Sequence, residues 1–213
     1  MSQIILDISA NTHNNYWPYL KRMLDELKAI DTGKNEIIIK HQLFEKAGKN
    51  IPLRHSVFQC ARSHAEGLGY KTTASVFDLS SLKFLLNYNV LFVKIANRRD
   101  LDWLISEIPR KIPIYLSSDN TKVMPCNDNF YECEICKPIT YMACVSKYPA
   151  TIEDYENTGW NLKSVAISDH TAGLDLYKKY QPAIWEKHFK LSDSTGLDAG
   201  PFAITPKELA EIL

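Results

Sequence analysis

The feature that most constrains the fold is a regular alternation of two kinds of segment. Short apolar runs rich in isoleucine and valine cover residues 4–9, 36–42, 70–77, 91–96, 112–117, 139–146, 164–168 and 183–189. Near-continuous apolar character is typical of parallel strands that are buried on both faces. The stretches between them, such as 17–30 and 55–69, repeat apolar residues every three or four positions, which indicates helices. The alternation therefore predicts an α/β fold, a closed (β/α)₈ TIM barrel.

The length makes this barrel a small one. The chain has 213 residues, of which 45% are hydrophobic and 23% charged, which suits one globular domain over residues 1–213. Barrels of this type typically have ~250 residues. The segment between the fifth and sixth runs has no helical period, so we expect a compact barrel with a shortened or missing crossover helix after strand 5. Thr205 and Pro206 predict the start of a last helix that runs to the C-terminus.

Charge and composition exclude several function classes. The formal net charge is zero and the pI is about 7.0, so no general attraction to nucleic acid or to an anionic membrane is expected. No run approaches the ~20 apolar residues of a membrane span, and the N-terminus lacks the basic region of a signal peptide. We therefore predict a cytoplasmic protein that acts on small molecules. An odd number of cysteines fits a reducing compartment. For the cluster of Cys126, Cys133 and Cys136, ordinary loop cysteines are favoured over a metal or redox role.

Two lysines interrupt the apolar runs. Lys40 and Lys94 lie where strands are expected to end, at the carboxyl face where barrels of this type carry their active sites. A buried ammonium is costly without a partner. A bound phosphate or carboxylate would compensate it, with help from the strand-end hydroxyls of Ser75, Ser117, Ser146 and Ser168. The alternative is that each lysine pairs with an internal carboxylate such as Asp7 or Glu186; two lysines within one ring of hydroxyls favour the anion site.

The last two runs each end in a carboxylate and a histidine. Asp169 precedes His170, and Glu186 precedes His188 by two positions. Two histidines on successive strands, each beside a carboxylate, indicate a divalent-metal site with open coordination positions. The alternative is a pair of histidines satisfied by hydrogen bonds. Asp169 or Glu186 could serve as a further ligand, an orienting group or a general acid/base, and those roles stay open.

Short motifs in barrel order carry a family resemblance. "SDHT" and "EKHF", preceded by "KHQ", "VKIA" and "CVSKYP", resemble the sialic acid synthase (N-acetylneuraminate synthase) family. The resemblance runs from "DISANTH" to "GPFAITPKEL" and covers the barrel domain only, without the family's C-terminal antifreeze-like domain. It implies a synthase that condenses phosphoenolpyruvate with an N-acylated amino sugar such as N-acetylmannosamine, giving a sialic-acid-type nonulosonate and phosphate.

The resemblance also implies roles for single residues. His170 and His188 match the family's metal-binding histidines, which usually serve Mn²⁺ or Mg²⁺. The catalytic positions are Asp7, Glu186 and Asp100. The substrate-binding positions are Lys40, Gln42, Ser75, Lys94, Asn97, Ser117, Ser146, Tyr148 and Ser168.

The sequence departs from the family pattern at the expected sugar end. "KIANRRD" places Arg99 where the family carries a glutamate, with Asp100 one residue later, and Ser146 replaces an asparagine. Two alternatives therefore stand beside the synthase: a barrel that binds phosphoenolpyruvate or a similar anion without turnover, and a phosphoenolpyruvate condensation or aldolase acting on another aldose. The implied partners are these small substrates and either a second copy, forming a homodimer, or a second chain that completes the site.

Overall fold

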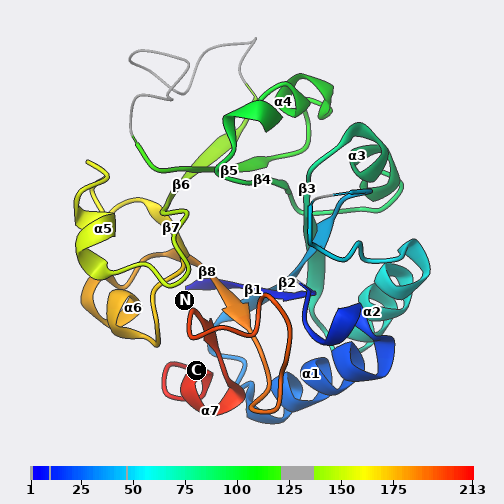
Figure 1. Ribbon diagram of the computed structural model, residues 1–213, viewed down its shortest axis with the longest axis horizontal. Helices are drawn as coiled ribbons and strands as arrows, with labels where there is room; N and C mark the ends of the chain where they lie inside the picture. Colours follow the sequence, from blue (N-terminus) through cyan, green and yellow to red (C-terminus); the bar gives the residue numbers. More distant parts are fainter. Residues whose placement is uncertain (1, 10, 47, 121–136) are drawn as a thin grey trace.

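The computed structural model describes residues 2–9, 11–46, 48–120 and 137–213, and its strands form a closed barrel (Figure 1). The strands are hydrogen-bonded in chain order, and β1 also pairs with β8, which closes the sheet. All of these pairings are parallel. The strands are β1 (Gln3–Ser9), β2 (Glu36–Leu43), β3 (Lys71–Val76), β4 (Val93–Ile95), β5 (Ile114–Ser118), β6 (Ile139–Cys144), β7 (Ala166–Asp169), β8 (Ile184–Phe189) and β9 (Ala203–Ile204).

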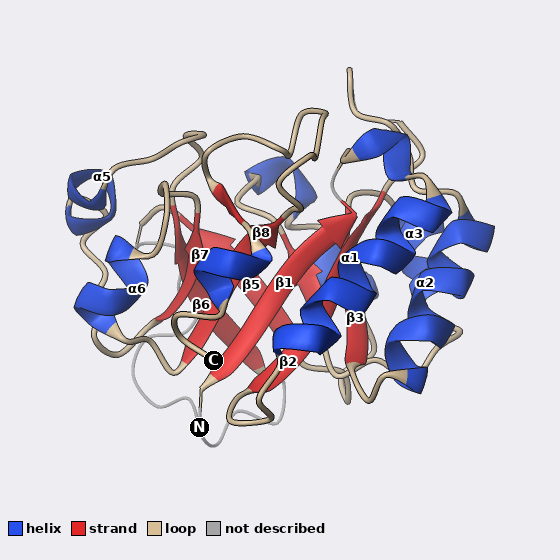
Figure 2. Ribbon diagram, turned by 90° about the horizontal axis from the view of Figure 1, so that it is seen from below, coloured by secondary structure: helices blue, strands red, loops and turns tan. Residues whose placement is uncertain are grey.

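Helices surround the strands on the outside, as Figure 2 shows for the side that carries α1. They are α1 (Trp17–Ile30), α2 (His55–Gly67), α3 (Leu79–Leu85), α4 (Leu104–Glu107), α5 (Ile152–Glu156), α6 (Asp175–Tyr180) and α7 (Pro206–Leu209), with two 3-10 turns, η1 (His13–Asn15) and η2 (Arg99–Leu101). In α1 the buried side chains recur every three or four positions, so the helix presents one apolar face to the barrel. These residues are Tyr19, Leu20, Met23, Leu24 and Leu27.

The apolar core has two parts. The larger part lies between strands and helices. The smaller part is a plug inside the barrel, built from one residue of each of five strands or strand entries: Ile5, Ile38, Phe92, Met142 and Ala166. Side chains alternate between the two faces of a strand, so the plug residues and the helix-facing residues come from alternate positions. The plug closes the amino-terminal half of the barrel interior and leaves the carboxyl ends for polar side chains.

The eight predicted strands and the barrel are confirmed. β9, a pair of residues that extends the sheet beyond β8, was not predicted, because two residues are too few to produce a hydrophobic period. The last helix is shorter than expected and ends at Leu209. Most of the crossover after β5, with the predicted loss of its helix and the three clustered cysteines, lies outside the described residues. None of the helices within the described ranges is long and apolar enough to cross a membrane.

Candidate active site

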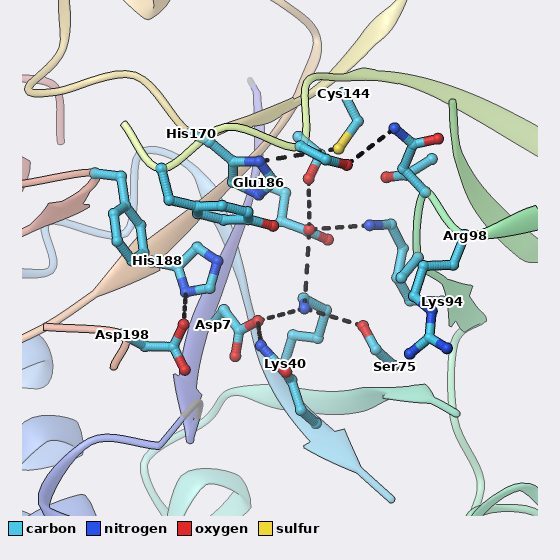
Figure 3. Close-up of a pocket in the computed structure, with 18 of the residues that line it drawn as sticks. Asp7, Lys40, Ser75, Lys94, Arg98, Cys144, His170, Glu186, His188 and Asp198 are labelled. Atoms are coloured by element: carbon cyan, nitrogen blue, oxygen red, sulfur yellow. Dashed lines mark hydrogen bonds and ion pairs between the residues drawn. The ribbon is translucent and has the colours of Figure 1, made fainter. Parts of the chain in front are cut away.

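A polar layer lies directly above the apolar plug. Because residues two apart share a face of a strand, the inward residue that follows each plug residue is one pleat nearer the carboxyl end. Two positions after the five plug residues lie Asp7, Lys40, Lys94, Cys144 and Ser168. Ser117 and Glu186 follow, by the same step, Tyr115 and Ile184, which are partly buried and pack against the plug. These polar residues line a pocket of about 540 Å³ (Figure 3). The sheet register therefore gathers residues from β1 to β8 at one point.

Lys40 is the centre of the first cluster in the pocket. Its Nζ donates to Asp7 Oδ2 at 2.6 Å and to Ser75 Oγ at 3.0 Å, and Gln42 Nε2 donates to the same Asp7 oxygen at 2.9 Å. Burial opposes both charges, yet the attraction between the two groups raises the pKa of Lys40 and lowers the pKa of Asp7. Both groups are therefore ionised at neutral pH.

Glu186 is the centre of the second cluster. Its Oε1 accepts from Lys94 Nζ at 3.0 Å and from Ser168 Oγ at 2.9 Å, and Lys40 Nζ lies 3.8 Å away. Burial alone would raise the pKa of Glu186, but the two ammonium groups outweigh it and lower the pKa to about 2. Both lysines thus have the internal carboxylate partners that the sequence offered as the alternative to an anion site. They also line the pocket, so these pairings do not remove them from contact with a ligand.

Two carboxylate oxygens and one hydroxyl in this layer are unsatisfied. Asp7 Oδ1, Glu186 Oε2 and Ser117 Oγ are buried and have no hydrogen-bond partner among the described residues. Buried polar atoms normally have a partner, and an exception in a pocket points to a bound molecule or water. These atoms can accept from a hydroxyl or, in the case of Ser117, donate to an anion.

The two predicted metal ligands lie side by side on β7 and β8. The ring centroids of His170 and His188 are 5.5 Å apart, and the Tyr148 ring packs 4.3 Å from that of His170. His170 Nδ1 lies 2.7 Å from the Val145 carbonyl oxygen, which can only accept, so Nδ1 carries the proton and Nε2 the lone pair. Burial lowers the pKa of His170 to about 3, so the ring is neutral at pH 7.

Asp198 joins the histidines from the loop after β8. Its Oδ1 lies 3.6 Å from His188 Nδ1, and its Oδ2 accepts from Asn11 Nδ2 at 2.9 Å. Burial raises the pKa of Asp198 although the neighbouring His188 and Asn11 oppose the rise. Asp198 lines the pocket and was not found from the sequence, because it follows no apolar run; its chemistry depends on a loop that folds back over the barrel.

The donor set fits a divalent ion only in part. No group of three or more His, Cys, Asp or Glu side chains converges tightly enough to hold a metal within the described ranges. His188 Nδ1, however, is buried without a hydrogen-bond partner among the described residues, and His170 Nε2 keeps its lone pair. The lone pair of His170 Nε2 and the adjacent His188 ring could supply two nitrogen ligands, and oxygen atoms of a bound substrate and water, which Mn²⁺ and Mg²⁺ prefer, would have to complete the coordination.

Most of the predicted site residues come together. The pocket is lined by Asp7, Lys40, Gln42, Ser75, Lys94, Asn97, Ser117, Ser146, Tyr148, Ser168, His170, Glu186 and His188. Asp100 is not among the described residues that line it: η2 turns its side chain into solvent, 61% exposed and paired with Arg98. Asp169 faces the opposite side of β7, where it accepts from Trp185 Nε1 at 3.0 Å and lies 3.1 Å from Lys187 Nζ.

Known proteins resemble this chain in sequence. The chain is 26% identical over 204 residues to an uncharacterized protein of Methanocaldococcus jannaschii, a match that covers 89% of this chain and 60% of that protein. It is 29% identical over 172 residues to the pseudaminic acid synthase of Helicobacter pylori, covering 72% of this chain and 48% of the synthase. The chain thus spans about half to three-fifths of the length of these curated relatives.

Solved structures share the fold. An N-acetylneuraminic acid synthetase from Leptospira borgpetersenii, solved with citrate, superposes with a TM-score of 0.72 at 21% identity over 98% of this chain and 80% of that one. A truncated 3-deoxy-D-arabino-heptulosonate 7-phosphate synthase from Thermotoga maritima gives 0.62 at 9% identity over 99% and 83%. A family model, described as the NeuB family, matches residues 28–213. With most of its length matched by that model, the chain belongs to the NeuB family.

Proposed function

We propose that this protein is a phosphoenolpyruvate-condensing synthase whose acceptor is an N-acylated amino sugar of the N-acetylmannosamine type. The observation that carries the proposal is the polar layer beside the histidine pair. Its open pocket is surrounded by two buried lysines and a serine hydroxyl that has no hydrogen-bond partner among the residues that the structure describes. Lysines and hydroxyls suit the phosphate and carboxylate of phosphoenolpyruvate. Membership of the NeuB family supports the same reaction class.

The two ends of the pocket would divide the substrates. Lys40 and Lys94 hold the anionic groups of phosphoenolpyruvate over the plug, with the hydroxyls of Ser75 and Ser117 as further donors. The sugar aldehyde lies toward His170 and His188. Because both reactants are bound next to each other above the apolar plug, they react in a fixed orientation and not through a chance encounter in solution.

His170 and His188 would hold the divalent ion, which when bound supplies Lewis-acid polarisation of the aldehyde oxygen. The methylene carbon of phosphoenolpyruvate bonds to the aldehyde carbon, whose oxygen takes up a proton and becomes a hydroxyl. Water adds to the resulting cationic C2 and loses a proton. Loss of phosphate from that adduct leaves the 2-keto acid. Glu186 and Asp7 are the carboxylates placed to accept the proton of the attacking water, because each has a buried oxygen with no hydrogen-bond partner in the described part of the chain.

Release of inorganic phosphate from phosphoenolpyruvate tests the proposal. We expect release that requires Mn²⁺ or Mg²⁺ and N-acetylmannosamine or another N-acylated amino sugar of an aldose panel, and that is lost in His170→Ala. His55→Ala, an exposed histidine of α2 outside the pocket, is the matched control and should retain full activity. Phosphoenolpyruvate binding without release from any aldose would favour the anion-binding barrel instead. Release with an unacetylated aldose, identified by product mass, would favour the other condensation.

A further inference from the structure

Arg98 differs from the other basic residues of the pocket in where its partner lies. Lys40 and Lys94 are paired with carboxylates inside the pocket, whereas Arg98 lines the pocket and is paired with Asp100, which does not line it in the described part of the chain. Arg98 Nε donates to Asp100 Oδ1 at 3.1 Å, and Nη2 bonds the second carboxylate oxygen. Figure 3 shows Arg98 on the same side of the pocket as Lys94 and Ser75.

The charged residues at the base of the pocket leave a need for a further positive group, which Arg98 can supply. Lys40 and Lys94 are offset by Asp7 and Glu186, so these four residues contribute no net charge. Phosphoenolpyruvate brings two negatively charged groups, a phosphate and a carboxylate. The two lysines can bind these groups, but the four residues together add no net positive charge to balance them. Arg98 is 50% exposed and Asp100 61% exposed, and an exposed ion pair is held weakly enough to exchange partners.

The neighbouring polar groups suit a phosphate at this position. Asn97 precedes Arg98 and donates to Ser146 Oγ at 3.2 Å, and both residues line the pocket. The Ser117 hydroxyl, on the next strand, is buried without a partner among the described residues. A phosphate has three acceptor oxygens, and a planar guanidinium can bind two of them at once.

We propose that Arg98 exchanges Asp100 for the phosphate of phosphoenolpyruvate and covers that phosphate from the mouth of the pocket. Asp100, which the family resemblance implied to be catalytic, then acts as the resting partner of Arg98 and competes with substrate. The inference rests on the proposed function, because it assumes that phosphoenolpyruvate binds in this pocket.

Calorimetric titration of phosphoenolpyruvate in the absence of sugar tests the exchange. Arg98→Ala should weaken binding about tenfold or more, the usual size for a charge-assisted contact, and Arg98→Lys should recover part of the loss. Asp100→Asn should tighten binding about two- to fivefold, because it removes the competitor. A residue that only supports the fold would not make binding tighter when its partner is neutralised. The matched control is the exposed pair of Arg22 and Asp193 outside this pocket, where Arg22→Ala and Asp193→Asn should leave the affinity unchanged.

Two further probes identify the group that Arg98 binds. Inorganic phosphate should lose affinity in Arg98→Ala as phosphoenolpyruvate does, whereas pyruvate, which carries only the carboxylate, should not. An equal loss for pyruvate, or unchanged phosphoenolpyruvate affinity in Arg98→Ala or Asp100→Asn, would overturn the inference while the proposed function stands. Wild-type protein that binds neither phosphoenolpyruvate nor phosphate would overturn both.

Discussion

At the residue scale, neighbouring residues of one strand have different roles, because one faces the pocket and the next faces the helices. Ser168 and Glu186 face the pocket, whereas Asp169 and Lys187, their immediate neighbours, face the helices as a fully buried ion pair. Lys187 Nζ also donates to the Thr171 carbonyl oxygen at 2.6 Å. The same residue types therefore serve the ligand on one face of a strand and the fold on the other, because side chains alternate.

Removing Asp169 should destabilise the protein strongly. Asp169→Ala leaves the Lys187 ammonium buried without its carboxylate, which typically costs about 3–5 kcal/mol of unfolding free energy. Urea unfolding followed by circular dichroism measures it. Asp169→Ala combined with Lys187→Met should recover part of the loss, because no charge is then left buried. Glu211→Ala, which breaks an exposed pair with Lys178, is the control and should change little. A small effect of Asp169→Ala would show that the pair does not hold β7 to β8.

At the element scale, the loops after β1 and β8 meet across the mouth of the barrel. Thr12 and Gly196 form an antiparallel bridge, and His13 N donates to the Thr195 carbonyl oxygen at 2.9 Å. The Asn11 side chain bonds both Asp198 and the backbone N–H of Ile51. These contacts place Asp198 beside His188 without any strand carrying it.

Gly196→Ala should displace this pair of loops. Gly196 has φ of +110°, and a Cβ there would lie 2.1 Å from the Asn11 carbonyl oxygen, so backbone must move. We expect the KM for the sugar to rise severalfold through loss of the Asp198 position, with a smaller change in phosphoenolpyruvate affinity, which depends on the opposite side of the pocket. Gly67→Ala is the matched control, because a Cβ there would meet no atom of the described residues within 4 Å. Equal losses for both substrates would contradict this division of the pocket.

The packing of β2 against α2 should make stability depend on pH. His41 is fully buried against Phe58, and burial lowers its pKa from 6.5 to about 4. In the unfolded chain His41 binds a proton below about pH 6.5, whereas the buried ring stays neutral down to about pH 4. The contribution of His41 to the free energy of unfolding is therefore complete above pH 6.5 and decreases as the pH falls toward 4, by up to about 3 kcal/mol. Unfolding free energies measured from pH 7 to 4 should fall less steeply in His41→Asn than in wild type. The exposed His55→Asn should keep the wild-type slope, and identical slopes for all three proteins would refute the assignment.

Hydrophobic periodicity in the sequence predicted the strands and the polar residues at their ends. The pocket residues that lie on loops were not predicted. The apolar runs located all eight barrel strands, and their polar ends located Lys40, Lys94 and the two histidines. Asp198 and Arg98 were not recognised as pocket residues, because each follows a strand through irregular backbone. Asp100 was expected in the site, but one turn of 3-10 helix directs it into solvent. The pairing of each lysine with a particular carboxylate also required the register of the closed sheet.

At the scale of the whole molecule, closure of the sheet makes the site and the barrel depend on each other. Lys94 of β4 reaches Glu186 of β8 across the interior, so ligands that bind the polar layer contact strands distant in sequence. We propose that residues 1–213 fold as one domain, and such a domain should unfold in a single transition that ligand binding shifts as a unit.

Phosphoenolpyruvate should therefore raise the thermal midpoint of the whole barrel. A ligand at 100 times its Kd adds about 2.7 kcal/mol, which in a domain of this size corresponds to roughly 5–10 °C. Lys94→Ala should abolish the shift, because it removes a phosphate- or carboxylate-binding ammonium, whereas Lys178→Ala on the surface should preserve it. Differential scanning calorimetry with and without ligand measures the ligand-induced shift separately for each variant. The lower midpoint that we expect for Lys94→Ala without ligand therefore does not affect the comparison. A shift of equal size in Lys94→Ala would show that the ligand binds elsewhere. A shift confined to one part of a split transition would show that the barrel does not unfold as one unit.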